Sequence, residues 1–284
     1  MVNSTSLLKD GIEILKKKGI TSHRLDAEIL LSTIVKKDRI KLLLNENLKI
    51  TQKKASAFSN LIKRREKKEP IAYLTQNKEF FSFPFFVDSN SLIPRPETEL
   101  LVEKILDIYK RKTPKILDIG TGTGCIIISI LKNLPKARGL AIDISKNALK
   151  IAKINAKKIL KKGSINLKFK QNSIQRFSGK REFDIVVSNP PYIPTFQIKT
   201  LSEDIKNFEP KLALDGGKDG LDVIKKVIYK SKYILRTNGI LALEIGNGQF
   251  YSVSLLLKNN FFRIKYLIKD FKNNVRCVIS ELKN

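Results

Sequence analysis

The 284-residue chain has few of the side chains that most often build metal sites, redox sites or charge relays. It contains two cysteines, one histidine, one methionine and no tryptophan. The cysteines, Cys125 and Cys277, lack the spacing of a metal-binding or redox motif, so we expect free thiols, a reducing compartment and no metal site. The histidine, His23, has no second ligand or nucleophile beside it, which favours a surface or capping role over catalysis.

The sequence also lacks a membrane-spanning segment. No stretch approaches the roughly 18 consecutive apolar residues that a transmembrane helix needs. The first five residues, Met1 to Thr5, do not place a basic segment before an apolar one, as a secretory signal would. We therefore expect a soluble cytoplasmic protein without a membrane partner.

Acidic residues are scarce relative to basic ones. The chain has 55 lysines and arginines against 27 acidic residues, a formal net charge of +28. Such a charge is typical of nucleic-acid-binding proteins, and Lys63-Arg64-Arg65 with Lys67-Lys68 would form a basic stripe. The lysines are nevertheless spread along the whole chain and lack the interleaved aromatic residues of a base-stacking surface. We favour a general enrichment in lysine and expect no specific nucleic-acid partner, only a weak non-specific attraction to ribosomes or acidic partners.

Length and apolar patterning predict about two domains. Apolar residues make up 42% of the chain, enough to build cores. From Ser4 to about Lys68 they recur at helical spacing, which predicts a small helical-bundle domain over residues 1–78. The aromatic run from Phe80 to Val87 predicts an edge hairpin that continues to Ile93, within a linker over residues 79–95. A second domain, residues 96–284, begins with Pro96 in the first turn of a helix.

A glycine-rich loop follows the first buried strand of this second domain. The strand, Lys115 to Asp118, runs into a loop before an apolar helix that reaches Leu134. A second strand, Leu140 to Ile142, ends in Asp143, about 20 residues beyond the loop, where doubly wound folds place an acid on ribose hydroxyls. The loop residues are Gly120, Thr121, Gly122, Thr123 and Gly124.

Other interpretations of this pattern are a flexible loop and, for Asp143, a helix N-cap ahead of Ser145. A nicotinamide-type dinucleotide site would need its third glycine one residue after Gly124, so the spacing disfavours it. Strand, loop, helix, strand and acid in this order instead predict a different cofactor site.

The remaining strands predict a doubly wound, Rossmann-like α/β sheet. We expect strands over residues 165–169, 183–187 and 239–245, the first of them followed by Asn172 and Ser173. Residues 262–268 and 275–280 are separated by a short polar turn, which predicts an antiparallel hairpin at the C-terminal edge of the sheet.

The fourth strand ends in the tetrapeptide Asn189-Pro190-Pro191-Tyr192. A planar amide or amino nitrogen is hard to alkylate because its lone pair is delocalised, so an enzyme must restrain its N–H bonds and aim the nitrogen. The Asn189 side-chain carbonyl can accept one N–H and the Pro190 backbone carbonyl the other, while the Tyr192 ring stacks on the planar group. The alternative is a proline-rich turn that closes a strand.

Sheet topology relates this tetrapeptide to the glycine loop. In a doubly wound sheet the fourth strand lies beside the first, and the carboxyl ends of both open onto one crevice. We therefore expect Asn189 and the glycine loop to face each other across a cofactor.

With these features, the chain resembles the class I S-adenosylmethionine-dependent methyltransferases, and within them the HemK-like peptide chain release factor glutamine methyltransferases. The resemblance covers almost the whole chain. Its most specific part is Ile93-Pro94-Arg95-Pro96-Glu97-Thr98-Glu99, because adenine methyltransferases share the Asn-Pro-Pro-Tyr motif. The other segments are Leu117 to Gly124, Val187 to Ile193, Phe208-Glu209-Pro210, Ala213 to Gly217, Asp219-Gly220-Leu221 and Leu243 to Gly246.

The resemblance implies S-adenosylmethionine as the cofactor and a class I peptide chain release factor as the partner. The methyl acceptor would be the glutamine of its Gly-Gly-Gln motif, and residues 1–78 would bind the release factor. Asn189, Pro190 and Tyr192 would be catalytic, and these three with Pro191 would bind the substrate. Cofactor binding would fall to Gly120, Thr121, Gly122, Thr123, Gly124, Asp143, Asn172, Ser173 and Asn189, with Arg95, Glu97 and Thr98 as further site residues over the cleft.

The chain departs from the family pattern at two positions. Asn172 stands where the family usually has an acid near the adenine; its carbonyl can still accept from an amino group, so we expect cofactor binding to be retained but weaker. Gln76 replaces a common glycine of the interdomain turn. Three other functions stay open: an adenine N6-methyltransferase, a glutamine methyltransferase of a large-subunit ribosomal protein, and a non-catalytic RNA-binding protein on a methyltransferase scaffold.

Overall fold

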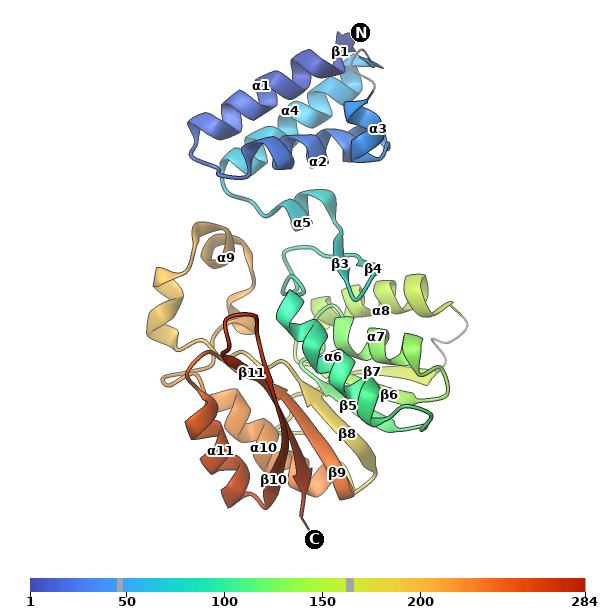
Figure 1. Ribbon diagram of the computed structural model, residues 1–284, viewed down its shortest axis with the longest axis vertical. Helices are drawn as coiled ribbons and strands as arrows, with labels where there is room; N and C mark the ends of the chain where they lie inside the picture. The colour runs from blue at the N-terminus through green and yellow to red at the C-terminus, as the bar shows by residue number, and fades with distance from the viewer. Residues whose placement is uncertain (45–47, 162–165, 284) are drawn as a thin grey trace. The chain divides into compact units, whose positions relative to one another are not determined.

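The computed structural model describes residues 1–44, 48–161 and 166–283. They form two compact units (Figure 1). The first unit consists of Met1–Asn77 and Ser202–Phe208, and the second of Lys78–Leu201 and the chain from Glu209 onward. No sequence pattern indicates that Ser202–Phe208 groups with the first 77 residues. Among the described residues, no helix combines the length and the apolar character that a membrane crossing requires.

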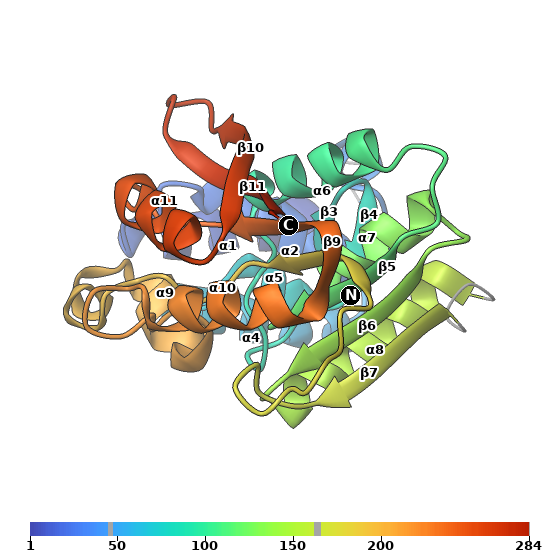
Figure 2. The same ribbon diagram turned by 90° about the horizontal axis from the view of Figure 1, so that it is seen from below.

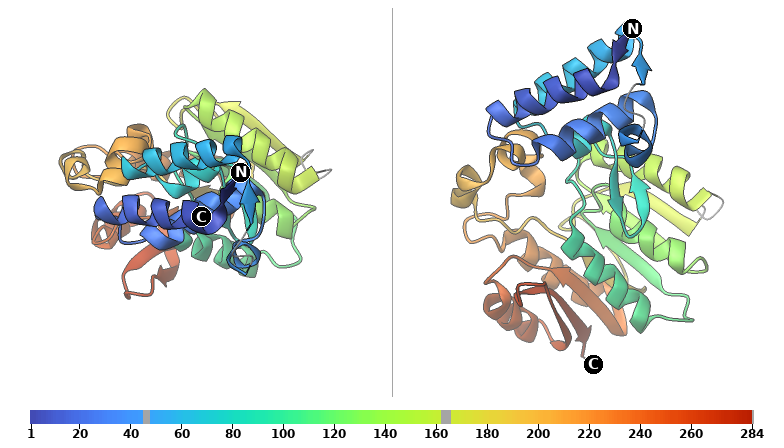
Figure 3. Two further views of the ribbon diagram at one scale, coloured as in Figure 1. Left: turned by 90° about the horizontal axis from the view of Figure 1, so that it is seen from above. Right: turned by 45° about the horizontal axis from the view of Figure 1, so that its top comes forward.

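The first unit is mainly helical, which confirms the helical region predicted from apolar spacing. Two short strands, β1 (Val2–Asn3) and β2 (Lys49–Ile50), pair antiparallel. Figure 3 gives two further views of the helices. They are α1 (Ser4–Lys17), α2 (His23–Val35), α3 (Arg39–Leu43), α4 (Gln52–Glu66), α5 (Ile71–Thr75) and α9 (Glu203–Phe208).

The core of the first unit lies between α1, α2 and α4. Leu15, Leu30 and Phe58 are buried there. Gly11 lets α1 approach α4 closely, because a Cβ atom at this position would lie only 2.8 Å from Cζ of Phe58. A larger residue would therefore push the two helices apart.

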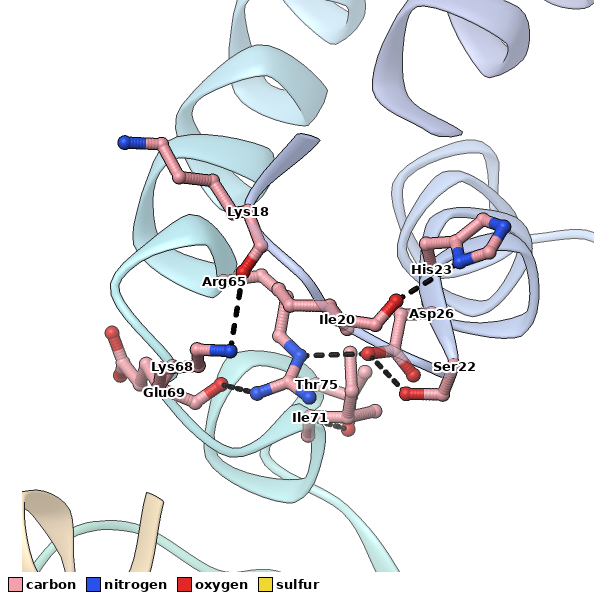
Figure 4. Close-up of polar contacts among 10 residues, drawn as sticks. All are labelled: Lys18, Ile20, Ser22, His23, Asp26, Arg65, Lys68, Glu69, Ile71 and Thr75. Carbon is pink, nitrogen blue, oxygen red and sulfur yellow. Dashed lines mark hydrogen bonds and ion pairs between the residues drawn. The ribbon is translucent and has the colours of Figure 1, made fainter. Parts of the chain in front are cut away.

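A polar cluster joins α2 to the end of α4 (Figure 4). Nε of Arg65 donates to Oδ2 of Asp26 at 2.7 Å, and the Ser22 hydroxyl donates to the same oxygen at 2.9 Å. Arg64 pairs with Glu69. Two arginines of the basic stripe are therefore engaged in ion pairs within the unit. Nδ1 of His23, the first residue of α2, lies 2.9 Å from the Ile20 carbonyl oxygen, so its ring makes a local contact just ahead of the helix.

The second unit contains the predicted α/β sheet. The strands from β9 to β7 run parallel, and β11 lies antiparallel between β9 and β10, which confirms the predicted C-terminal hairpin. Residue 165, where we expected the third strand to begin, lies outside the described residues. The order is β10 (Phe262–Lys269), β11 (Val275–Leu282), β9 (Leu235–Glu244), β8 (Phe183–Ser188), β5 (Lys115–Ile119), β6 (Arg138–Asp143) and β7 (Leu167–Gln171).

Side chains alternate between the two faces of this sheet. On β5, Ile116 belongs to the core on one face, and Leu117 and Ile119 belong to the core on the other. Because both faces are covered, the ends of the strands are where a ligand can approach the sheet. The covering helices are α6 (Pro96–Ile108), α7 (Cys125–Asn133) and α8 (Lys146–Leu160) on the first face, and α10 (Asp222–Ile234) and α11 (Phe250–Asn259) on the second (Figure 2).

The aromatic run forms a hairpin that is smaller than expected. The strands β3 (Lys78–Phe80) and β4 (Phe83–Phe85) pair only with each other, as a separate two-stranded sheet, so the expectation of an edge hairpin reaching Ile93 was wrong. The hairpin groups with the second unit, where the backbone N–H of Phe81 donates to Oε1 of Glu99 at 2.9 Å. Two short 3₁₀ helices, η2 (Thr195–Thr200) and η3 (Lys211–Ala213), lie between β8 and α10 in the sequence.

Candidate functional site

The candidate site lies where β5 and β8 run side by side, at the switch point of the sheet. On one side of β5 lies β6, the next strand in the sequence, and on the other side lies β8, which comes much later. The Ser188 hydroxyl, at the end of β8, donates to the Ile119 carbonyl at the end of β5 at 2.7 Å. The glycine loop and the Asn-Pro-Pro-Tyr tetrapeptide therefore begin at neighbouring points.

The glycines of the loop meet two different needs. Gly120, Gly122 and Gly124 all have positive φ angles, of 70°, 55° and 80°. Among the described residues, nothing lies within 4 Å of a Cβ built on Gly120 or Gly122, so these two leave open space for a ligand. A Cβ on Gly124 would lie 2.7 Å from Cδ1 of Ile128, so the third glycine allows close packing of α7.

Asp143 links this loop to the start of α8. Its Oδ2 accepts from the Gly122 N–H at 2.9 Å, and its Oδ1 accepts from the Ser145 N–H at 2.8 Å. Burial raises the pKa of Asp143, and these backbone donors oppose the rise. The N-cap of α8 is Ser145, whose hydroxyl accepts from the Ala148 N–H at 3.1 Å. The capping role considered for Asp143 therefore falls to Ser145.

Asn172 and Ser173 follow β7, which pairs with β6 on the side away from β5. Asp143 ends β6, so in the order of strands it lies between these two residues and the glycine loop. The backbone N–H of Asn172 donates to the Asp143 carbonyl at 3.0 Å. The Ser173 hydroxyl accepts from the Arg176 N–H at 3.2 Å and so caps a local turn. The structure thus brings Asn172 next to Asp143 and uses the Ser173 side chain locally.

Thr123 is tied to the rest of the unit by a buried amide that the sequence analysis missed. Nδ2 of Asn155, on α8, donates to the Thr123 carbonyl at 3.0 Å. Oδ1 of Asn155 accepts from the Phe86 N–H at 2.7 Å. A polar residue within the apolar face of α8 is the signal that could have identified it. Asn155 fixes the end of the loop against the segment after β4.

Asp118 is a second residue that the sequence analysis did not assign to the site. It is fully buried, and its Oδ2 accepts from the Thr121 hydroxyl at 2.6 Å. Its Oδ1 has no hydrogen-bond partner among the described residues. Burial raises the pKa of Asp118 to about 7, and the Thr121 hydrogen bond opposes that rise. An acid inside an otherwise apolar strand was the available signal, because a buried carboxylate needs partners.

Asn189 is held from one side of its amide. Nδ2 of Asn189 donates to Oγ1 of Thr98, on α6, at 3.2 Å. Among the described residues, no donor reaches Oδ1 of Asn189 or the carbonyl oxygen of Pro190. Pro190 itself is buried, and Asn189 is half-buried. Two carbonyl oxygens at the end of β8 are therefore available to accept hydrogen bonds from a ligand.

Behind the tetrapeptide lies Glu244, a buried acid at the end of β9. Its Oε2 accepts from the Thr98 hydroxyl at 2.6 Å, and its Oε1 lies 3.4 Å from the Tyr192 hydroxyl. Nη2 of Arg276, on β11, is 3.6 Å from Oε1 and donates to the Tyr192 hydroxyl at 3.0 Å. Burial raises the pKa of Glu244, while Thr98, Arg276 and Tyr192 oppose the rise. Thr98 was predicted as a site residue from the sequence, whereas Glu244, an acid in the apolar run before Gly246, was not.

The backbone of Pro191 and Tyr192 is braced by the loop before α10. A Cβ on Gly216 would lie 2.8 Å from the Pro191 carbonyl oxygen, and one on Gly220 would lie 2.4 Å from that of Tyr192. Nε2 of Gln249 donates to the Tyr192 carbonyl at 2.9 Å. These close approaches explain why glycines stand in this loop.

Arg95 lies at the start of α6 and is paired with a buried acid. Its Nη2 donates to Oε1 of Glu209 at 2.6 Å, and Oε2 of Glu209 lies 3.4 Å from the Ile93 nitrogen. The pair connects the Ile-Pro-Arg-Pro-Glu-Thr-Glu segment to the Phe-Glu-Pro segment. Its main contribution is therefore to fix the backbone that leads to Thr98.

Comparisons with known proteins cover both parts of the chain. Residues 6–75 match the PrmC N-terminal domain, and residues 96–205 match the methyltransferase small domain. The release factor glutamine methyltransferase of Clostridium acetobutylicum is 37% identical over 96% of this chain and 98% of its own length. The bifunctional methyltransferase of Rickettsia felis is 35% identical over 96% of this chain, which spans 57% of that protein.

A solved structure shows the same fold at low identity. The hMettl16 catalytic domain, in complex with MAT2A 3′UTR hairpin 6, has a TM-score of 0.58 at 15% identity. The likeness covers 85% of this chain and 86% of that one. At this identity it shows only the fold, a Rossmann-like methyltransferase sheet.

Proposed function

The chain belongs to the family of release factor glutamine methyltransferases, and on this premise we propose that it methylates the glutamine of the Gly-Gly-Gln motif of class I peptide chain release factors. It is an S-adenosylmethionine-dependent methyltransferase. The methyl group goes to N5, the side-chain amide nitrogen of the glutamine. The observation that supports this acceptor is the pair of open carbonyl oxygens on Asn189 and Pro190 beside the glycine loop.

The residues around the glycine loop fit S-adenosylmethionine. Open space lies over Gly120 and Gly122, and the buried Oδ1 of Asp118 has no partner among the described residues. A carboxylate in this position suits a cofactor with a cationic ammonium group and a cationic sulfonium group. We assign cofactor binding to the backbone of Gly120 to Gly124, to Asp143 for the ribose hydroxyls and to Asn172, Ser173 and Asn189.

The contribution of the protein to the reaction is alignment. When bound, S-adenosylmethionine would supply a methyl group on a sulfonium sulfur, with the neutral thioether as the leaving group, and the proton lost by the amide nitrogen would pass to solvent. Asn189 and Pro190 accept the two N–H bonds of the substrate amide and so direct its nitrogen. Tyr192 packs its ring on the amide plane, supported by Pro191. Holding reactants in a near-attack geometry can lower a barrier by roughly 7 to 11 kcal/mol.

We assign release-factor binding to the helical domain, residues 1–78, and methyl transfer to residues 96–284, joined by the linker over residues 79–95. Residues 6–75 match the PrmC N-terminal domain, apart from the methyltransferase small domain at residues 96–205, and this division supports separate roles for the two parts. Release factors act on translating ribosomes, so a cytoplasmic location belongs to the same proposal. Neither a membrane nor a specific nucleic acid is part of it.

Methyl transfer from labelled S-adenosylmethionine tests the function. The purified protein is incubated separately with a class I release factor, with the same factor after Gln→Ala substitution in Gly-Gly-Gln, with a large-subunit ribosomal protein, and with DNA or RNA. We expect label only on the unmodified release factor. Label on the ribosomal protein or on nucleic acid would overturn the substrate and leave the fold and cofactor in place.

A further inference from the structure

The orientation of the Asn189 amide decides whether the proposed function can work. A side-chain amide has nearly the same shape when it is turned over, but its oxygen accepts hydrogen bonds and its nitrogen donates them. A substrate NH₂ group can bind only the oxygen. Some other part of the protein must therefore fix which end of the amide faces the cleft.

We propose that Glu244 orients both polar side chains of the tetrapeptide, Asn189 through the Thr98 hydroxyl and Tyr192 directly. Thr98 and Glu244 are then positioning residues for the methyl transfer, and neither touches the substrate. The proposal rests on the proposed function, in which Asn189 accepts from the substrate amide.

The Thr98 hydroxyl has a single proton to donate. Glu244 is fully buried, and as a carboxylate it can only accept. Oγ1 of Thr98 lies 2.6 Å from its Oε2, within the usual range for a hydroxyl that donates to a charged oxygen. Once this proton is committed, Oγ1 of Thr98 can only accept from a third group. The Asn189 group 3.2 Å away must therefore be the NH₂ end, which leaves Oδ1 for the substrate.

The proton of the Tyr192 hydroxyl is directed in the same way. The Arg276 guanidinium can only donate, and its Nη2 lies 3.0 Å from the Tyr192 hydroxyl. The hydroxyl therefore accepts from Arg276 and directs its own proton toward Oε1 of Glu244, 3.4 Å away. The guanidinium also lies over the Tyr192 ring, 5.4 Å from its centre. One buried acid thus fixes the rotation of both side chains.

The groups around Glu244 maintain this direction of the two hydrogen bonds. Arg276 lies 3.6 Å from Oε1 and supplies a positive charge from β11. Glu97, in the first turn of α6, supplies the opposing negative charge. Cys277, which pairs with Glu244 across the two strands, is buried, and burial raises its pKa, so it stays a neutral thiol. Among the described residues, Thr98 and Tyr192 are the two groups that donate hydrogen bonds to the Glu244 carboxylate.

The test replaces Thr98 with an isosteric residue that has no hydroxyl. In Thr98→Val the Asn189 amide loses its fixed partner, and we expect kcat for release-factor methylation to fall roughly 10- to 100-fold. Affinity for S-adenosylmethionine, measured by calorimetry, should change little. Thr98→Ser keeps the hydroxyl and should restore most of the rate. Glu244→Gln can present either end of its amide to Thr98 and should behave like Thr98→Val. Thr200→Val removes an exposed hydroxyl of the same unit and serves as the matched control.

A second measurement does not depend on the substrate. The ¹⁵N–¹H signals of the Asn189 side chain, assigned from their loss in Asn189→Ala, should report slow proton exchange in the wild type and fast exchange in Thr98→Val. Wild-type kcat in Thr98→Val, or unchanged exchange, would overturn the proposal. So would a rate that Thr98→Ser fails to restore, because that would indicate a purely structural role. If the wild-type protein does not methylate a release factor, the proposed function fails, and the exchange measurement still decides the orientation.

Discussion

Asn189 is the residue on which turnover should depend most directly. Asn189→Ala removes one acceptor for the substrate amide but leaves the glycine loop and Asp143 intact. By analogy with the loss of one preorganised hydrogen-bonding group, we expect kcat to fall by about 100-fold or more. Cofactor affinity should stay within a few-fold, as calorimetry would show. A near-normal rate of methyl transfer would rule out the role assigned to Asn189.

Asp118 should make stability depend on pH near neutrality. Burial raises its pKa from the ordinary 3.8 to about 7, so the folded protein holds this proton more tightly than the unfolded chain does. The stabilisation from the protonated form is complete below 3.8 and is lost as the pH rises through about 7. Asp143 lies close enough to contribute to the shift.

The matching experiment compares the wild type with Asp118→Asn. Between pH 5 and pH 7 the wild type should lose roughly 2–3 kcal/mol of unfolding free energy that the variant does not lose. Urea unfolding at several pH values measures the free energy of unfolding of both proteins. Parallel pH profiles for the two proteins would show that Asp118 does not titrate in this range.

Individual elements hold the site residues through close backbone contacts, and the loop before α10 shows this most clearly. Gly220 has a φ of 75°, and a Cβ there would lie 2.4 Å from the Tyr192 carbonyl oxygen. Gly220→Ala should therefore displace the tetrapeptide and lower kcat by about 10-fold or more, beyond the loss of stability. Gly19→Ala is the control, because Gly19 has a φ of 68° and open space around its Cβ position within the described residues.

Both glycine variants force a non-glycine residue into the left-handed region, at about 1–2 kcal/mol. Only Gly220→Ala adds a collision beside the site. Thermal unfolding should therefore show a larger loss of stability in Gly220→Ala than in Gly19→Ala, and the methyl-transfer rate of the folded protein should fall only in Gly220→Ala. Equal activities would contradict a bracing role for the loop.

Elements with strong local patterns could be predicted from the sequence, and elements without them could not. The strands β5, β6 and β8 appear where apolar runs end in glycine, aspartate or asparagine. The hairpin at β3 and β4 is shorter than predicted, because aromatic alternation does not show where pairing stops. Helix α9 groups with the first unit without any local signal, since that grouping depends on contacts with residues far away in the chain.

For the whole molecule, the two units have separate cores. They should unfold in separate transitions, and each transition should respond to substitutions within its own unit. Asp26 and Arg65 form an ion pair in the first unit, with side chains 6% and 13% exposed. Asp26→Ala would leave a largely buried arginine without this partner, at about 3 kcal/mol. In Asp26→Ala we expect the first unit to unfold at a lower temperature than in the wild type, while the second unit still binds S-adenosylmethionine.

Scanning calorimetry with and without cofactor measures both effects. The control is Asp10→Ala, at an exposed position of α1, which should change neither transition. Loss of cofactor binding in Asp26→Ala at a temperature where the second unit is folded would contradict independent units. Loss of release-factor methylation alone would support the binding role proposed for residues 1–78.

The sequence by itself determined the α/β class, the helical N-terminal part, the place of the fourth strand beside the first and the family. Each of these depends on a local pattern: apolar periodicity, the glycine loop after a strand, Asp143 at the next strand end, and the tetrapeptide from Asn189 to Tyr192. Such patterns persist in the sequence because they act between residues that are close along the chain.

Only the tertiary structure decided what supports the tetrapeptide. Thr98 and Glu244 are 146 residues apart, on α6 and β9, yet they share a hydrogen bond of 2.6 Å beside Asn189. The unpartnered oxygen of Asp118 likewise follows from its burial. No local pattern encodes these contacts, because they exist only once the sheet has brought its strand ends together and removed the carboxylates from water.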